Sequence, residues 1–143
     1  MTPDYELIET PPPIADFRRL RKDAGLTEKS EEAAAIGLRN TWFGVHIVHN
    51  NEAIGMGRII GDGGCHFQVV DVAVLPEHQG KGLGKDIMAA LILYFEAHAP
   101  ASAYISLIAD GLAKDLYAQY GFRAVAPKSI GMSRWVHTNR ISD

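Results

Sequence analysis

One stretch in the middle of the chain constrains the fold most: an apolar strand pattern runs into alternating glycines and then into a helical pattern. The apolar run over 66–75 ends at Pro76, and three glycines follow at positions 80, 82 and 84. Over 82–98, apolar residues recur three and four positions apart, which is typical of one face of a helix. This order predicts a strand, a glycine-rich turn and a helix. The turn is either a plain connection or a loop whose unpaired amides hold a phosphate.

The remaining patterns place this unit in a larger mixed sheet. Strands are expected at 5–9, 43–48, 53–60, 66–75, 104–108, 122–125 and 130–135, and helices at 14–24, 31–39, 82–98 and 112–120. An Asn-Asn pair at 50–51 predicts a hairpin between the second and third strands. The order β-α-α-β-β-β-α-β-α-β-β predicts an α/β (α+β) fold: a mostly antiparallel mixed sheet flanked by helices.

Length and composition limit the classes of function. With 143 residues the chain is expected to form a single domain over 1–143, with its core at about 5–135 and a disordered tail at 136–143. A net charge of −3 gives no electrostatic reason to bind nucleic acid or an anionic membrane. The longest apolar run, 87–95, is too short to span a bilayer, and no secretory signal pattern is present at the N-terminus. A cytoplasmic location is therefore expected, and a single cysteine, Cys65, fits it.

The glycine turn can be compared with known phosphate loops by its spacing. A P-loop requires Ser or Thr after Gly-Lys, whereas Asp86 follows Gly84-Lys85. A dinucleotide-binding loop requires a third glycine three positions after Gly82, where the chain has Lys85. Neither pattern fits. The segment that remains is Gln79-Gly80-Lys81-Gly82-Leu83-Gly84, which has the form Gln/Arg-x-x-Gly-x-Gly/Ala.

Three linked segments resemble the GNAT superfamily of acyl-CoA-dependent N-acetyltransferases. They are the strand end Asp71-Val72-Ala73-Val74-Leu75-Pro76, the loop above, and Ala113-Lys114-Asp115-Leu116-Tyr117-Ala118-Gln119-Tyr120-Gly121-Phe122. The last is similar to the family's Ala-x-x-Leu-Tyr-x-x-x-Gly-Phe signature. All three occur in the family's order, and the resemblance extends from Tyr5 to about Trp135.

The resemblance implies a coenzyme A site. Loop amides would hold the pyrophosphate of acetyl-CoA, the strand backbone would pair with its pantetheine arm, and Asp110 stands where the family often has Asn. The implied cofactor-binding residues are Val72, Ala73, Val74, Gln79, Gly80, Lys81, Gly82, Leu83, Gly84, Lys85 and Asp110. An ionised Asp110 accepts a hydrogen bond but cannot donate one, which is a departure from the family pattern.

Two residues are candidates for acid and base. The family's usual proton donor is a tyrosine at the position of Tyr117, and a phenol is protonated at neutral pH. The alternative is that Tyr117 only packs its helix. Asp71 interrupts an apolar strand, where burying a carboxylate costs free energy, so a functional role is expected for it. We predict that Asp71 accepts the amine proton, directly or through water. An equal alternative is that it binds the substrate ammonium or a backbone amide.

The acceptor site is expected in the first half of the chain. Trp42 and Phe43 could form an aromatic wall, with Asn40 beside them and Asp62 supplying charge, or the two aromatic residues could belong to the core. The six histidines have no ligand spacing, so no metal site is expected, and His78 is expected to be a solvated loop residue.

The resemblance implies an N-acetyltransferase that moves acetyl from acetyl-CoA to a primary amine, and we expect a small-molecule acceptor and direct attack in a ternary complex. The alternatives are acetylation of a protein N-terminus or lysine, and a non-catalytic module that senses acetyl-CoA. No nucleic-acid or membrane partner is expected. The closing strand, ending at Trp135, could supply the edge of a homodimer.

Overall fold

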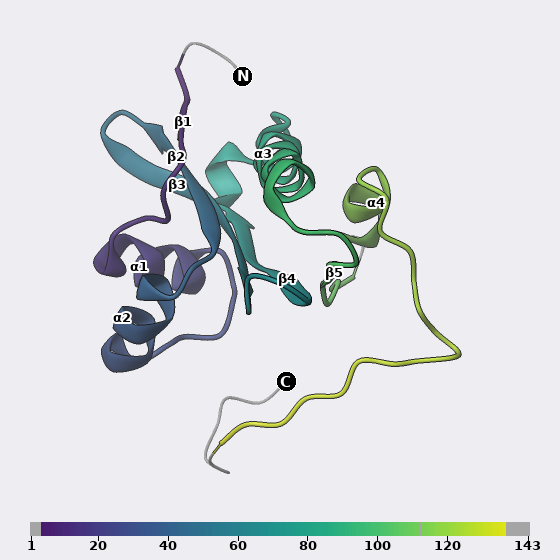
Figure 1. Ribbon diagram of the computed structural model, residues 1–143. Helices are drawn as coiled ribbons and strands as arrows, with labels where there is room; N and C mark the ends of the chain where they lie inside the picture. The colour runs from purple at the N-terminus through teal and green to yellow at the C-terminus, as the bar shows by residue number, and fades with distance from the viewer. Residues whose placement is uncertain (1–3, 112, 137–143) are drawn as a thin grey trace.

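The computed structural model describes residues 4–111 and 113–136, and its core is a sheet between helices (Figure 1). The elements, in chain order, are β1 (Glu6–Ile8), α1 (Ile14–Asp23), α2 (Glu31–Arg39), β2 (Phe43–His49), β3 (Glu52–Gly61), β4 (His66–Val74), the 3-10 turn η1 (Pro76–His78), α3 (Leu83–His98), β5 (Tyr104–Ser106) and α4 (Ala113–Ala118). The α/β fold predicted from the sequence is confirmed, and the observed bounds of these elements lie close to the predicted ones.

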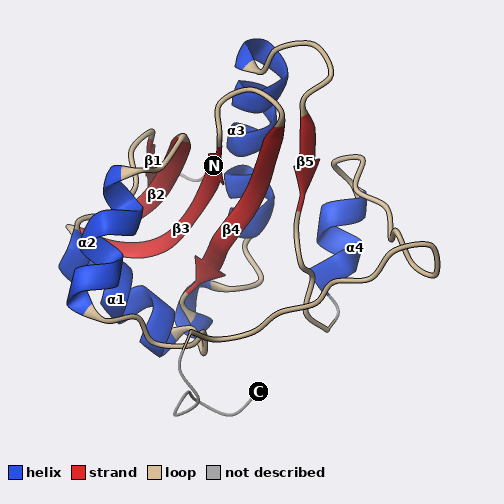
Figure 2. Cartoon of the chain, turned by 60° about the horizontal axis from the view of Figure 1, so that its bottom comes forward, coloured by secondary structure: helices blue, strands red, loops and turns tan. Residues whose placement is uncertain are grey.

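The five strands lie in the order β1-β2-β3-β4-β5. Neighbours are antiparallel from β1 to β4, whereas β5 is parallel to β4 because α3 carries the chain back between them. Helices α1 and α2 cover one face of the sheet and α3 covers the other, with α4 beside β5 (Figure 2). Because both faces are covered, β2 and β3 are buried along most of their length.

Local sequence accounts for one hairpin turn and one bulge of the sheet. Asn50 and Asn51 both adopt positive φ, of 50° and 62°, as a two-residue hairpin turn of the predicted kind requires. Between β3 and β4 the register shifts, so that Gly57 lies opposite both Asp71 and Val72. This bulge places Asp71 at a φ of 59°, a conformation that aspartate tolerates better than most residues.

The core lies on both faces of the central strands. Leu20 from α1 and Ile87, Met88 and Leu91 from α3 have fully buried side chains. Gly57 allows α3 to approach the sheet closely, since a Cβ atom there would lie 2.5 Å from Cγ2 of Ile87. Among the described residues, no helix has the length and apolar character needed to cross a bilayer.

The prediction of two closing strands at 122–125 and 130–135 is wrong. Residues 122–136 form turns and extended chain, which runs below the sheet (Figure 1), and they have no ladder partner among the described residues. Gly131 has no side chain to pack, which weakens the second of these segments as a strand. The predicted disordered tail lies outside the described residues except for Val136.

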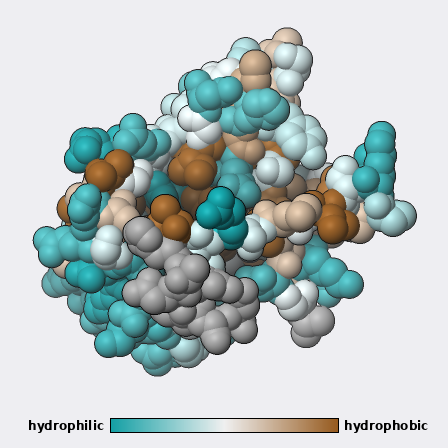
Figure 3. All heavy atoms as spheres, turned by 90° about the horizontal axis from the view of Figure 1, so that it is seen from below, coloured by the Kyte–Doolittle hydropathy of each residue, from teal (hydrophilic) through white to brown (hydrophobic). Residues whose placement is uncertain are grey.

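Several apolar residues of this segment are exposed, among them Val125, Ile130 and Met132. Seen from below, hydrophobic atoms (brown) are interrupted by hydrophilic ones (teal) over the described part of this side (Figure 3). Such scattered apolar residues are common on protein surfaces and do not by themselves indicate a docking face.

Candidate active site

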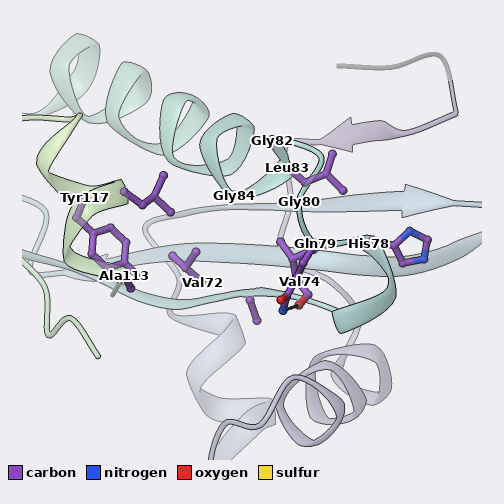
Figure 4. A pocket seen from close by; sticks show the side chains of 12 residues that line it. Val72, Val74, His78, Gln79, Gly80, Gly82, Leu83, Gly84, Ala113 and Tyr117 are labelled. Atoms are coloured by element: carbon purple, nitrogen blue, oxygen red, sulfur yellow. Dashed lines mark hydrogen bonds between the residues drawn. The ribbon is translucent and has the colours of Figure 1, made fainter. Parts of the chain in front are cut away.

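A pocket of about 400 Å³ lies where β4, the glycine loop, α3 and α4 meet (Figure 4). Strand, loop and helix N-terminus form one side, and the short helix α4 forms the other. The lining residues are Val72, Ala73, Val74, His78, Gln79, Gly80, Gly82, Leu83, Gly84, Ala113, Leu116 and Tyr117. The structure therefore brings together all three segments on which the sequence prediction was based.

The strand side of the pocket is open because β4 and β5 separate. They pair only over His66–Gln68 and Tyr104–Ser106. Farther along β4, Val74 and Ala73 pair with β3 on one side, and β5 does not pair with them on the other. The backbone of this stretch can thus accept an extended ligand as an additional strand, as predicted for pantetheine.

The glycine loop is shaped for an anion. Gly80 and Gly82 have φ values of 79° and 80°, and a Cβ atom at either position would meet nothing within 4 Å. Gly82 is the N-cap of α3, and no side chain caps this helix. The first amides of the helix therefore remain available as donors, and the helix dipole adds positive potential. These features fit a pyrophosphate group.

Side chains of the loop hold its shape and add charge. The Nε2 amide of Gln79 donates to the carbonyl oxygen of Val74 over 2.9 Å, which ties the loop to the end of β4. Lys81 and Lys85 are exposed, and the Lys81 ammonium lies 5.9 Å from the ring centre of Tyr5. Both lysines are near the loop but neither lines the pocket.

Tyr117 is the ionisable residue of α4 that lines the pocket. Partial burial, and then the nearby charge of Asp110, raise the pKa of its phenol above the ordinary value. The phenol therefore stays protonated at neutral pH, which is the state a proton donor needs. Tyr120 differs: it lies outside the pocket lining, and its hydroxyl donates to the carbonyl oxygen of Lys85 over 2.8 Å.

Asp71 is held between two arginines. Its Oδ1 atom accepts from Arg21 of α1, and its Oδ2 atom accepts from Nε of Arg58 at 2.9 Å. The side chain is only 8% exposed and does not line the pocket. Because both oxygens are engaged by cations, this geometry favours an electrostatic role at the bulge over the predicted role as a base.

The residues expected to bind the acceptor lie outside the pocket. Trp42 packs edge-on against Phe67, with ring centres 4.6 Å apart, and Phe43 stacks on Tyr94 at 3.8 Å. The structure thus favours the core role that the sequence left open for both aromatic residues, because α3 covers this face of the sheet. The Asn40 side chain donates to the carbonyl oxygen of Ile36 at the end of α2.

Asp62 and Asp110 also lie outside the pocket lining. The Oδ1 atom of Asp62 accepts three backbone amides of the β3–β4 turn, from Gly64, Cys65 and His66. These hydrogen bonds lower the pKa of its carboxyl group, and they indicate a turn-forming role. Asp110 is exposed and acts on the pocket through its charge on Tyr117.

Three lining residues were not predicted: His78, Ala113 and Leu116. Ala113 and Leu116 belong to the signature of α4, and their helical spacing with Tyr117 could have indicated a shared face. His78 is not simply solvated, because its Nδ1 atom lies 2.7 Å from the hydroxyl of Tyr5, a contact that sequence spacing cannot reveal. Among the described residues, no cluster of three or more potential metal ligands is present.

Comparison with known proteins decides the family. A sequence model of the acetyltransferase (GNAT) domain matches residues 26–137, which is most of the chain. The chain belongs to the GNAT acetyltransferase family. The GNAT fold and the transferase class predicted from the three segments are thereby confirmed, and members of this family normally use acetyl-CoA as a substrate.

Solved structures and a curated relative agree with the GNAT assignment. A protein from meticillin-resistant Staphylococcus aureus, described as a "Probable Acetyltransferase", is 41% identical with a TM-score of 0.87, over 92% of this chain and 98% of that one. A GNAT family acetyltransferase from Streptococcus pneumoniae shares the fold, with a TM-score of 0.73 at 19% identity, over 93% and 98% of the two chains. The chloroplastic GCN5-related N-acetyltransferase 2 of Arabidopsis thaliana is 38% identical over 71 residues, which cover 50% of this chain and 27% of that protein.

Proposed function

We propose that this GNAT protein is an acetyl-CoA-dependent N-acetyltransferase whose acceptor is a primary amine on a small molecule. One observation carries the proposal: Tyr117, the glycine loop and the unpaired edge of β4 all line the same pocket. A phosphate cradle at one end and a protonated phenol at the other suit acetyl-CoA, whose pyrophosphate and thioester sulfur lie at opposite ends of the pantetheine arm.

The residues of the chain have separate tasks in the proposed reaction. When bound, acetyl-CoA supplies the acetyl group and a thiolate leaving group. The loop amides bind the pyrophosphate, and the β4 backbone orients the extended arm toward α4. Tyr117 donates its phenolic proton to the departing sulfur, as the neutral amine of the acceptor forms the new C–N bond.

The proton balance closes without Asp71. The amine loses one proton when the amide forms, and Tyr117 gives one proton to the sulfur. We propose that solvent accepts the amine proton and returns a proton to the phenolate, because both oxygens of Asp71 are engaged by arginines. Direct attack needs both substrates bound together, which corresponds to a ternary complex.

Thiol release from acetyl-CoA tests the proposal. Purified protein is assayed with small amines, amino sugars, polyamines and peptides with free N-termini or lysines. Release stimulated by one group of small amines supports the proposal. Stimulation by peptides alone identifies a protein acetyltransferase, and acetyl-CoA binding without any release indicates a sensor module. Both of the latter outcomes contradict the proposal.

Gly82→Asp is expected to weaken acetyl-CoA binding at least about a hundredfold, or about 2.7 kcal/mol of binding free energy. The new carboxylate would stand at the N-cap of α3, where it repels a pyrophosphate and competes for the same amides. Isothermal titration calorimetry measures the effect.

Gly25→Asp is the matched control for this variant. Gly25 has a φ of 84°, and a Cβ atom there would meet nothing within 4 Å, so the backbone strain is similar. It lies after α1 and does not line the pocket. Acetyl-CoA affinity should be unchanged in this control, and equal weakening in both variants would refute the loop assignment.

The pH dependence of kcat should show no alkaline loss caused by Tyr117 between about pH 6 and about pH 9. Burial raises the phenol pKa above its ordinary value of about 10, so deprotonation of the donor begins only at higher pH. Loss of activity toward low pH is expected instead, as the acceptor amine becomes protonated. An alkaline midpoint below about pH 9 that persists with acceptors of different pKa would contradict the donor role of Tyr117.

A further inference from the structure

Three cationic side chains, none of which lines the pocket, gather on the α1 and α2 side of β4. Arg21 comes from α1, Arg58 from β3, and Lys29 from the segment before α2. Both arginine side chains are 9% exposed. Burial lowers the pKa of Arg21 from its usual value, so the surroundings supply poor solvation for its charge.

The negative charge in this cluster does not balance the positive charge. Asp71 is the carboxylate that pairs with Arg21 and Arg58 among the described residues. Lys29 is partly buried, and burial and the charge of Arg21 lower its pKa. One carboxylate therefore faces three cations. Because unpaired buried charge is costly, such a cluster is stabilised when an anion joins it.

Hydrogen bonds hold the two guanidinium groups in place. Arg21 donates from Nε to the carbonyl oxygen of Thr27 at 2.7 Å, and Arg58 donates from Nη1 to Oγ1 of Thr41 at 2.7 Å. Nη2 of Arg58 and Nζ of Lys29 make no hydrogen bond to a described residue. Neither of these two nitrogen atoms is fully buried. These two groups are therefore the donors of the cluster that no described residue engages.

The position of Lys29 is also defined. Its backbone carbonyl accepts from Nε of Arg18 at 3.0 Å, and its ammonium lies 5.1 Å from the ring centre of Trp135. A contact of this length corresponds to a cation–π interaction. The Trp135 ring therefore helps to position the Lys29 side chain, which is partly exposed to solvent.

The cluster is connected to the pocket through the backbone of β4 and lies apart from the glycine loop. Asp71 directly precedes Val72, which lines the pocket. The Cα atoms of two consecutive residues are about 3.8 Å apart. The cluster contacts α1, whereas the glycine loop begins α3 on the opposite face of the sheet (Figures 1 and 2). A pyrophosphate held by the loop is consequently not the partner of these cations.

We propose that the acceptor amine carries an oxyanion, a carboxylate or a phosphate, which binds to Lys29 and Arg58 while its amino group reaches the pocket beside Val72. This inference rests on the proposed function and specifies the acceptor class. Lys29 and Arg58 select the substrate by charge, and Asp71, which also pairs with Arg21, holds the Arg58 guanidinium in place.

The test compares acceptors that share an amino group and differ in charge. β-Alanine is compared with β-alaninamide, and O-phosphoethanolamine with ethanolamine, by thiol release at saturating acetyl-CoA. One anionic acceptor should have a kcat/KM at least about tenfold above that of its neutral partner. The two pairs distinguish a carboxylate from a phosphate. Equal values in both pairs would overturn the inference.

Lys29→Met tests which residue causes the preference. The variant keeps the length of the side chain and removes its charge. The preference should fall at least about fivefold, through a higher KM for the anionic acceptor, while the KM for acetyl-CoA stays unchanged. Lys22→Met is the control, since Lys22 is an exposed lysine of α1. A preference that survives in Lys29→Met, or that falls equally in Lys22→Met, would refute the role of Lys29.

A binding measurement separates this inference from the proposed function. Protein saturated with coenzyme A, which occupies the loop, is titrated with β-alanine and with O-phosphoethanolamine by calorimetry. Saturable binding of either amine that Lys29→Met weakens at least about fivefold supports the anion site even if no acetyl transfer is found. The absence of saturable binding by both, with no anionic preference in turnover, overturns the inference.

Discussion

Tyr117→Phe is expected to lower kcat by about 10²- to 10⁴-fold, the range typical of losing a general acid. The substitution removes one oxygen and keeps the ring that packs beside Phe122. Affinity for acetyl-CoA should stay nearly unchanged, because the loop and the β4 edge are untouched. Steady-state kinetics and calorimetric titration with acetyl-CoA measure the two quantities separately.

Tyr120→Phe is the matched control on the same turn of chain. It removes a hydroxyl that donates to the carbonyl oxygen of Lys85, outside the pocket lining, and its effect on kcat should be less than about fivefold. If Tyr117→Phe kept most of its kcat, the donor assignment would be wrong and solvent would have to protonate the sulfur. If both variants lost kcat alike, the effect would belong to the packing of this segment.

Asp71→Asn is expected to lower the free energy of unfolding by about 3–5 kcal/mol, the usual cost of breaking a buried ion pair by removing one partner. Asparagine accepts the positive φ of this position as well as aspartate does, so the backbone term is nearly constant. The loss would come from two buried guanidinium groups left without their carboxylate. Urea denaturation followed by circular dichroism measures it.

Asp16→Asn supplies the comparison for an exposed pair. Asp16 contacts Arg19 at 3.3 Å, but the two side chains are 38% and 31% exposed. Solvent screens such a pair, and its loss should cost no more than about 1 kcal/mol. If Asp71→Asn were equally mild, the carboxylate would not hold the arginines together. The role of Asp71 at the bulge would then have to be abandoned.

The ion pairs of Asp71 matter for function because Asp71 lies in the bulge of β4, next to the pocket-lining residue Val72. The bulge puts Asp71 and Val72 opposite a single residue, Gly57, and the pocket is lined from Val72 onward along β4. A carboxylate anchored to α1 and β3 fixes this irregular backbone where an extended ligand is expected to pair. The same residue thus connects sheet geometry with the charge of the proposed anion site.

The elements formed by short-range patterns were predicted from sequence. Helix α3 follows from apolar residues three and four positions apart, and the β2–β3 hairpin follows from two asparagines that tolerate positive φ. The glycine loop was predicted for the same reason, since its conformation depends on residues within it. The closing strands failed because a strand requires a partner edge, and the pattern of a strand does not name its partner.

The sequence by itself determined the helices, the first five strands, the glycine loop and the signature tyrosine of this GNAT protein, because each depends on residues within a few positions of one another. Tertiary structure decided the tasks of the remaining residues. Arg21 lies 50 positions from Asp71, and their pairing exists only because α1 packs on β4. Trp42 and Phe43 are partly buried because their rings pack against Tyr94 of α3. The role of a side chain depends on the residues that it contacts, and in the folded chain these residues can be far away in the sequence.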